Sequence, residues 1–255
     1  MSRESDAIAA IENLAKRNAP LLGVSTQNYA NNLRNALGVY DGFDREKLNR
    51  ALRAFRKLNV ELNKSQDRLE LWSRLSYVDE FLRMKCATDM MEHKLFPNSK
   101  EITESFGAYW AVCNWLDVDR ADPDIHIVAV GDGHAPRTAA TFAFRSKWMC
   151  HSVDPLLRGR ESWNDIRRLT VNRMMIEEWR APQNIKHAVV VAVHSHAKLP
   201  ASILPLQRAG CQKISIVAMP CCVPLELPGQ EPDIEFVDER VASKKNEIRI
   251  WSEVV

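Results

Sequence analysis

Apolar residues recur with a helical period through much of the first third of the chain. One such stretch follows Asp44, a residue type that caps helices, and places Leu48, Leu52, Phe55, Leu58 and Leu62 on one face. A second stretch carries Leu71, Leu75, Val78, Leu82 and Cys86. A third follows the break Phe96-Pro97-Asn98-Ser99 and carries Ile102, Phe106, Tyr109, Trp110, Cys113 and Leu116. We therefore predict an N-terminal helical region over residues 1–120.

From Asp122 onward the helical period gives way to short apolar runs that are typical of strands. Seven runs follow: His126–Val130, Trp148–Val153, Leu169–Met175, Ala188–His194, Ile214–Met219, Ile234–Val237 and Glu247–Trp251. The first five are separated by segments long enough for crossover helices, which predicts a parallel sheet. Only the short polar connection Ala242–Asn246 joins the last two, which predicts an antiparallel hairpin. Residues 121–255 are thus predicted to form an α/β domain.

A glycine loop follows the first predicted strand directly, in the sequence Gly131-Asp132-Gly133. Glycine allows a sharp turn and lets a ligand approach where a Cβ atom would clash. The amides of the loop and of the following helical turn are also free to bind a ligand. A structural turn would use the same residues, so the loop alone does not decide between the two interpretations.

The second predicted strand ends at Asp154, about 21 residues after Gly133. A carboxylate at this place offers two acceptor oxygens for the two hydroxyls of a ribose. A helix cap is the alternative role. We predict that Gly131, Asp132, Gly133 and Asp154 bind a nucleoside-containing cofactor, with Asp132 directed at its amino-acid end.

The predicted sheet, with five parallel strands closed by a hairpin, resembles the Rossmann-like fold of class I S-adenosylmethionine (SAM)-dependent methyltransferases. A dinucleotide-binding dehydrogenase would have a sixth parallel strand instead, so the hairpin favours SAM over NAD as the cofactor. The glycine loop departs from the family pattern at two points. Ala129 or Val130 stands where an acidic residue is usual, and Ala135-Pro136 replaces the third glycine.

Two polar clusters follow the fourth and fifth predicted strands, His194-Ser195-His196 and Pro220-Cys221-Cys222. Both should lie at the same edge of the sheet as the glycine loop. Over residues 124–224 the chain resembles a subgroup of Rossmann-like methyltransferases with a His-x-His/Cys motif after strand four and Pro-Cys-Cys after strand five. We predict that His194 and His196 are catalytic, with His194 as a general base.

The two cysteines are predicted to pack the floor of the crevice. A thiolate nucleophile, as in RNA 5-methylcytosine enzymes, is the alternative. The chain has six cysteines and no CxxC motif, and the adjacent Cys221 and Cys222 are poorly spaced for one tetrahedral ion. We therefore predict no metal site.

Charge and composition indicate which binding partners and which cellular compartment to expect. The net charge is +2, but seven Lys or Arg and only two Glu fall between Arg45 and Lys64, where an RNA contact would begin. Free thiols and the lack of an apolar leader are typical of a cytoplasmic protein without membrane contact.

We expect a SAM-dependent methyltransferase acting on RNA or another nucleic acid. A catalytically silent protein of the same fold, serving as a structural or RNA-binding subunit, is the first alternative. An NAD-dependent oxidoreductase and a small-molecule methyltransferase are the others.

Overall fold

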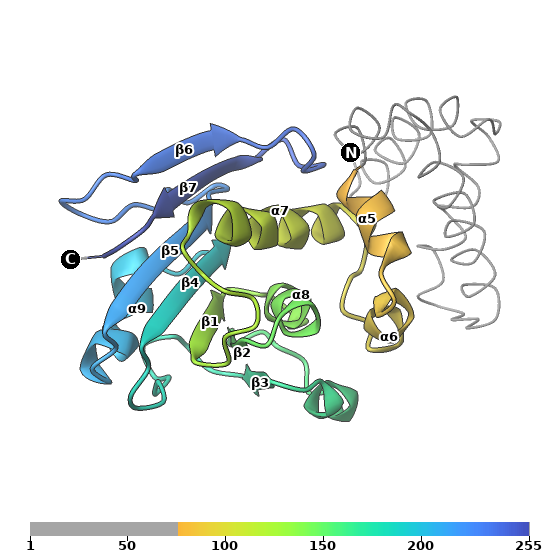
Figure 1. Cartoon of the computed structure of the whole chain (residues 1–255), viewed down its shortest axis with the longest axis horizontal. Helices are drawn as coiled ribbons and strands as arrows, with labels where there is room; N and C mark the ends of the chain where they lie inside the picture. Colours follow the sequence, from red (N-terminus) through yellow and green to blue (C-terminus); the bar gives the residue numbers. More distant parts are fainter. Residues whose placement is uncertain (1–75, 255) are drawn as a thin grey trace. The chain divides into compact units, whose positions relative to one another are not determined.

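The computed structural model describes residues 76–254 (Figure 1). The predicted helix over residues 44–62 and the basic segment Arg45–Lys64 lie outside them. The described chain belongs to two compact units, one ending at Thr103 and one beginning at Glu104. No helix among residues 76–254 has the length and the apolar character needed to cross a membrane.

The described part of the first unit is helical, as predicted, but the helix expected to reach Cys86 is divided. Helix α5 (Tyr77–Arg83) ends where Met84 adopts an extended conformation, and α6 (Ala87–Glu92) follows as a separate helix. A capping box starts α5: the hydroxyl of Ser76 accepts from the amide of Asp79, and the Asp79 carboxylate accepts from the amide of Ser76. The third predicted helix is α7 (Ser99–Trp115).

The second unit contains one seven-stranded sheet. Its strands are β1 (Ile125–Val130), β2 (Met149–Val153), β3 (Leu169–Asn172), β4 (His187–Val193), β5 (Lys213–Met219), β6 (Ile234–Val237) and β7 (Glu247–Trp251). The first five run parallel, whereas β7 pairs antiparallel with both β5 and β6. The predicted hairpin is therefore confirmed.

The spatial order β3-β2-β1-β4-β5-β7-β6 identifies the sheet as that of the Rossmann-like methyltransferases. The parallel order reverses between β1 and β4, which is where open α/β sheets bind ligands. Within residues 104–254, an antiparallel β7 occupies the position of the sixth parallel strand expected for a dehydrogenase.

The crossover helices are fewer than the spacing of the strands suggests. Helix α8 (Arg137–Arg145) joins β1 to β2, and α9 (Leu199–Arg208) joins β4 to β5. The connection from β2 to β3 contains only the short 3-10 helix η2 (Glu161–Asp165), and residues 173–186 before β4 form turns. These two connections are long enough for a crossover helix, as the sequence analysis noted, but neither contains an α-helix. Pro182 and the positive φ of 62° at Asn184 both interrupt a helix.

The third strand is also shorter than predicted, because the chain turns after Asn172. The Asn172 carbonyl accepts from the amide of Asp154, just after β2, and from the amide of Met174. That second bond closes a turn, so Met175 leaves the sheet and its side chain is about half exposed.

Helices cover both faces of the sheet (Figure 1). On one face the ring of Tyr109 on α7 packs edge-on against Phe142 of α8, with the centroids 5.3 Å apart. On the other face α9 contributes Leu199, Ile203 and Leu206 to a buried cluster with residues of β1, β4 and β5. With both faces covered, the carboxyl ends of the strands remain as the open edge where a site can form.

Candidate functional site

A cavity of about 570 Å³ lies at the carboxyl ends of β1, β2 and β4. Its size falls within the range of small-molecule and cofactor sites, roughly 300–1,000 Å³. The predicted site residues in its wall are Gly131, Gly133, Asp154, His194 and His196. The structure therefore brings together five of the six residues that the sequence pointed to, and Asp132 is the exception.

Gly131 holds the loop in a shape that another residue would adopt only with strain. Its φ is +79°, in the left-handed region, and a Cβ atom there would lie 2.8 Å from the Cβ of Ser195 and closer still to its hydroxyl. The amide of Gly131 donates to the carbonyl of Val153 on β2. Glycine thus lets the β1 loop fit tightly between the ends of β2 and β4.

Asp154 anchors the glycine loop from the end of β2. One carboxylate oxygen accepts from the amide of Gly133 at 2.7 Å, and the other accepts from the amide of Leu156 at 2.6 Å. Each oxygen can accept a second hydrogen bond. The residue lines the cavity although only 7% of its surface is exposed. Asp154 is therefore oriented and has acceptor capacity left for ligand hydroxyls.

The carboxylate of Asp132 makes structural contacts that the sequence did not predict. Its carboxylate accepts from the amides of Thr138 and Ala139 at the start of α8, and from the hydroxyl of Ser152 at 2.7 Å. Residue 132 is 3% exposed and lies outside the cavity wall. The carboxylate thus caps α8 and ties the loop to β2.

Apolar and cationic groups complete the cavity wall. Leu156 and Met175 are 60% and 49% exposed, and both line the cavity, so they present apolar surface to a ligand. Arg137 and Lys198 line it as well, and a guanidinium nitrogen of Arg137 donates to the carbonyl of Asp132. The wall therefore combines an apolar surface for a flat ring with cations suited to a carboxylate.

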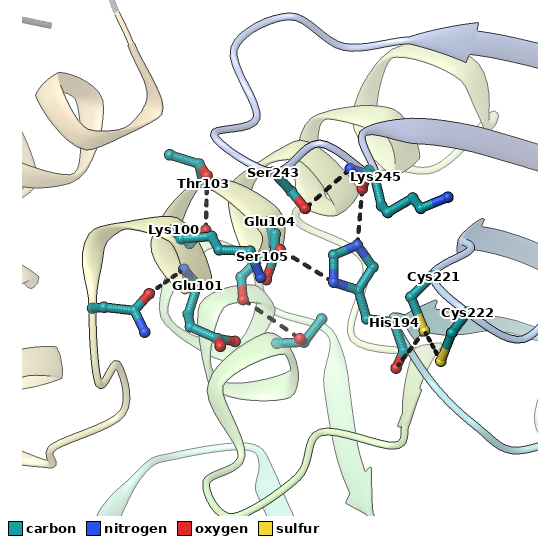
Figure 2. Close-up of polar contacts among 12 residues, drawn as sticks. Lys100, Glu101, Thr103, Glu104, Ser105, His194, Cys221, Cys222, Ser243 and Lys245 are labelled. Atoms are coloured by element: carbon teal, nitrogen blue, oxygen red, sulfur yellow. Dashed lines mark hydrogen bonds and ion pairs between the residues drawn. The ribbon is translucent and has the colours of Figure 1, made fainter. Parts of the chain in front are cut away.

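His194 sits just beyond β4 with its ring held from two sides (Figure 2). Its φ is +50°, so the extended backbone of β4 ends there. Nδ1 lies 3.1 Å from a carboxylate oxygen of Glu104 on α7, and Nε2 lies 2.9 Å from the carbonyl oxygen of Lys245. His194 thus joins the end of β4 to α7 and to the β6–β7 connection.

These contacts limit the protonation states of the ring. A carbonyl oxygen can only accept, so Nε2 carries a proton and donates to Lys245. Nδ1 faces a carboxylate oxygen of Glu104, so the two groups form an ion pair when Nδ1 is protonated and Glu104 is ionised. Glu104 is 1% exposed, and burial of this kind requires a partner for its charge.

Sequence reasoning missed Glu104. The signal was present, because the run Thr103-Glu104-Ser105 places three polar residues inside the apolar pattern of a helix. All three are buried, and the Ser105 hydroxyl lies 3.4 Å from that of Thr138 on α8. A buried carboxylate on such a helix implies a polar partner, but which partner depends on the fold.

His196, Cys221 and Cys222 converge beside the cavity. The Cys222 sulfur lies 3.3 Å from Nε2 of His196 and 3.6 Å from the Cys221 sulfur. Partial burial alone would raise the pKa of the Cys221 thiol, but hydrogen bonds from the amides of Val223 and Cys222, with help from the Cys222 and His196 side chains, lower that pKa to about 7. Cys150 is fully buried on β2, where burial raises its thiol pKa and leaves it inert.

Comparisons with known proteins give likenesses to solved structures only. No protein-family model matches the chain, and no curated protein sequence matches it. A cyclopropane-fatty-acyl-phospholipid synthase-like protein from Lactobacillus casei ATCC 334 aligns at 14% identity and a TM-score of 0.35, over 54% of this chain and 53% of that chain. This chain therefore spans about half the length of that protein.

Two further structures align at similar levels. A mutant of MtNAS in complex with S-adenosylmethionine aligns at 12% identity and a TM-score of 0.37, over 98% of this chain and 97% of that chain. Coclaurine N-methyltransferase bound to N-methylheliamine and SAH aligns at 10% identity and a TM-score of 0.33, over 83% and 63%. The class of fold assigned above follows from the strand order of this sheet.

Proposed function

We propose that this protein is a SAM-dependent methyltransferase that binds its cofactor in the cavity at the ends of β1, β2 and β4. The observation that carries the proposal is the meeting of Asp154 with the Gly131–Gly133 loop in the wall of that cavity. A carboxylate fixed beside a glycine loop is suited to the two hydroxyls of a ribose. The antiparallel β7 favours SAM over a nicotinamide dinucleotide.

The remaining parts of SAM find complementary groups in the same wall. Leu156 and Met175 offer exposed apolar surface beside Asp154, where an adenine ring attached to the ribose would pack. Arg137 offers a guanidinium for the carboxylate of the methionyl group. Asp132 is not included, because its carboxylate caps α8.

We assign the proton transfer to His194, with Glu104 as the residue that positions it. In methyl transfer the acceptor attacks the methyl carbon and the sulfonium leaves as a neutral thioether, so the acceptor's proton has to pass to a base. Glu104 fixes the ring through Nδ1, as a carboxylate orients a catalytic histidine. When the acceptor displaces the carbonyl of Lys245, the Nε2 proton passes to solvent and Nδ1 keeps a proton facing Glu104, so the Nε2 lone pair can take the acceptor's proton. His196 is the second proposed catalytic residue, since it lines the same cavity.

For the methyl acceptor we propose a nucleic acid, RNA in the first place. Two features support it: the basic segment Arg45–Lys64, and the cations Arg137 and Lys198 in the cavity wall. The tests are RNA binding measured over a range of salt concentrations and transfer of labelled methyl groups from SAM to RNA. We expect binding that weakens steeply as salt rises, and labelled RNA. A protein that binds RNA and SAM but transfers no methyl group would instead be the catalytically silent subunit. The contact of the Asp132 carboxylate with the start of α8 favours that alternative.

A variant of Asp154 tests the cofactor site. Asp154→Ala should weaken SAM binding by about 1.5–3 kcal/mol, because charge-assisted hydrogen bonds to the ribose are lost. A SAM analogue without ribose hydroxyls separates this effect from loosening of the loop. The wild type should discriminate against that analogue in calorimetry, and the variant should not. Glu161→Ala, an exposed acid outside the cavity wall, is the matched control. Unchanged affinity in a folded Asp154 variant would reject the assignment.

A further inference from the structure

We propose that His196, Cys221 and Cys222 form a binding site for Zn²⁺ with one coordination position left open. The three residues come from the connections after β4 and β5. Their potential ligand atoms, one imidazole nitrogen and two sulfurs, all lie within 4.8 Å of one another. Among residues 76–254, these three are the His, Cys, Asp or Glu side chains that come close enough together to hold a metal ion.

Two of the three separations are close to the edges of a zinc tetrahedron. Zn–S bonds of about 2.3 Å and Zn–N bonds of about 2.0–2.1 Å at tetrahedral angles put two sulfurs about 3.8 Å apart and a sulfur and a nitrogen about 3.6 Å apart. The two sulfurs here are 3.6 Å apart, and the Cys222 sulfur is 3.3 Å from Nε2 of His196. Small outward shifts along these two edges would fit an ion, and the third pair, the Cys221 sulfur and the imidazole of His196, lies within 4.8 Å.

The donor set selects the kind of ion. Two thiolates and an imidazole suit Zn²⁺, whereas Mg²⁺ and Ca²⁺ require oxygen ligands. His196 and Cys222 are exposed and Cys221 is half-buried, so the fourth position is open to water or to an added ligand. Three protein ligands with one open position are the arrangement of catalytic rather than structural zinc.

The local backbone explains how adjacent cysteines can share an ion. The sequence analysis judged adjacent cysteines poorly spaced for one ion, and in an extended strand neighbouring side chains do point to opposite faces. Strand β5 ends at Met219, and Cys221 and Cys222 lie in the bend that follows, so their sulfurs converge. At 3.6 Å the sulfurs are far beyond the length of a disulfide bond, about 2.05 Å.

Metal titration of the full-length, reduced and metal-free protein tests the proposal. Co²⁺ serves as the optical probe, and Zn²⁺ is then added in competition with a chromophoric chelator. We expect one equivalent of tightly bound metal, thiolate-to-cobalt charge-transfer bands and the intense visible bands of tetrahedral cobalt. His196→Ala and Cys222→Ser should each lower the affinity at least 100-fold. The matched control is Cys211→Ser, whose thiol contacts the carbonyl of Lys213 away from the cluster.

Three results would overturn the site. They are no metal binding by the reduced wild type, undiminished binding by a Cys221→Ser/Cys222→Ser double variant, and an equal loss in Cys211→Ser. Circular dichroism of each variant shows whether it is folded. A protein that is isolated with a Cys221–Cys222 disulfide and binds no metal after reduction also contradicts the proposal. None of these readouts requires SAM, so the zinc site and the methyltransferase function are tested separately.

Discussion

At the scale of single residues, two aspartates that look alike in the sequence have different roles. Asp132 lies in the glycine loop after the buried strand β1, and Asp154 follows the buried strand β2. The sequence analysis assigned both to the cofactor. The carboxylate of Asp132 accepts from the start of α8 and from Ser152, whereas that of Asp154 faces the cavity and holds Gly133. The difference depends on which groups surround each carboxylate. The spacing of residues along the chain does not predict those groups.

The pair His194–Glu104 carries a prediction about chemistry. His194→Ala should lower the rate of methyl transfer by about 10²–10⁴-fold and leave SAM affinity nearly unchanged. Glu104→Gln keeps an acceptor for Nδ1 but removes the negative charge, so the pKa of His194 should fall. The acidic limb of the pH–rate profile should therefore move to lower pH, which kinetics across pH would measure. A full rate for His194→Ala, or an unmoved profile for Glu104→Gln, would leave the pair with a purely structural role.

The candidate site was predictable wherever a residue's place follows from the end of a strand. Gly131, Gly133, Asp154, His194 and His196 all follow β1, β2 or β4 and line one cavity, as the rule for parallel sheets implies. Glu104 and Lys245 were not predictable, because they reach His194 from α7 and from the β6–β7 connection. Their approach depends on tertiary packing between segments far apart in the sequence.

At the scale of elements, the tight fit of the glycine loop leads to a prediction about stability. Gly131→Ala combines a left-handed φ with a clash against Ser195. Gly210→Ala is the matched control, because Gly210 has a φ of +72° but no atom within 4 Å of an added Cβ. We expect a loss of about 1 kcal/mol for the control and at least about 2 kcal/mol for Gly131→Ala in urea denaturation. Equal losses would mean that Ser195 moves aside without cost.

The buried histidines of the sheet lead to a prediction about pH. Burial, followed by the nearby His126, lowers the pKa of His151 on β2 to about 4. Its Nδ1 lies 2.7 Å from the hydroxyl of Thr170 on β3. An unfolded histidine has a pKa of about 6.5, so the unfolded chain binds the extra proton between these values. The stabilising effect is complete above pH 6.5 and is lost as the pH falls towards 4.

Urea denaturation of the wild type and of His151→Gln across pH 4–7 measures this effect. The slope of the unfolding free energy against pH should be smaller in the variant by up to about 1.4 kcal/mol per pH unit. Titrating groups that do not contact His151 contribute equally to both proteins and cancel in the difference, whereas His126, whose Nδ1 lies 3.0 Å from Nε2 of His151, changes its surroundings with the substitution. Identical slopes would contradict a neutral, buried His151.

At the scale of the whole molecule, the sequence predicted the sheet better than its connections. Strands were recognisable because buried parallel strands are continuous apolar runs, and both strands of the final hairpin have the predicted bounds. Connection length does not distinguish a helix from a series of turns, which is why residues 173–186 were misjudged. The hairpin mattered most, because it separates the methyltransferase sheet from the dehydrogenase sheet.

Calorimetric titration of the full-length wild type with SAM, with its demethylated product and with NAD tests the central claim most directly. The cavity beside Asp154 and the antiparallel β7 predict that SAM and the demethylated product each bind with a stoichiometry of one. They also predict no heat of binding for NAD. Binding of NAD without binding of SAM would contradict the account.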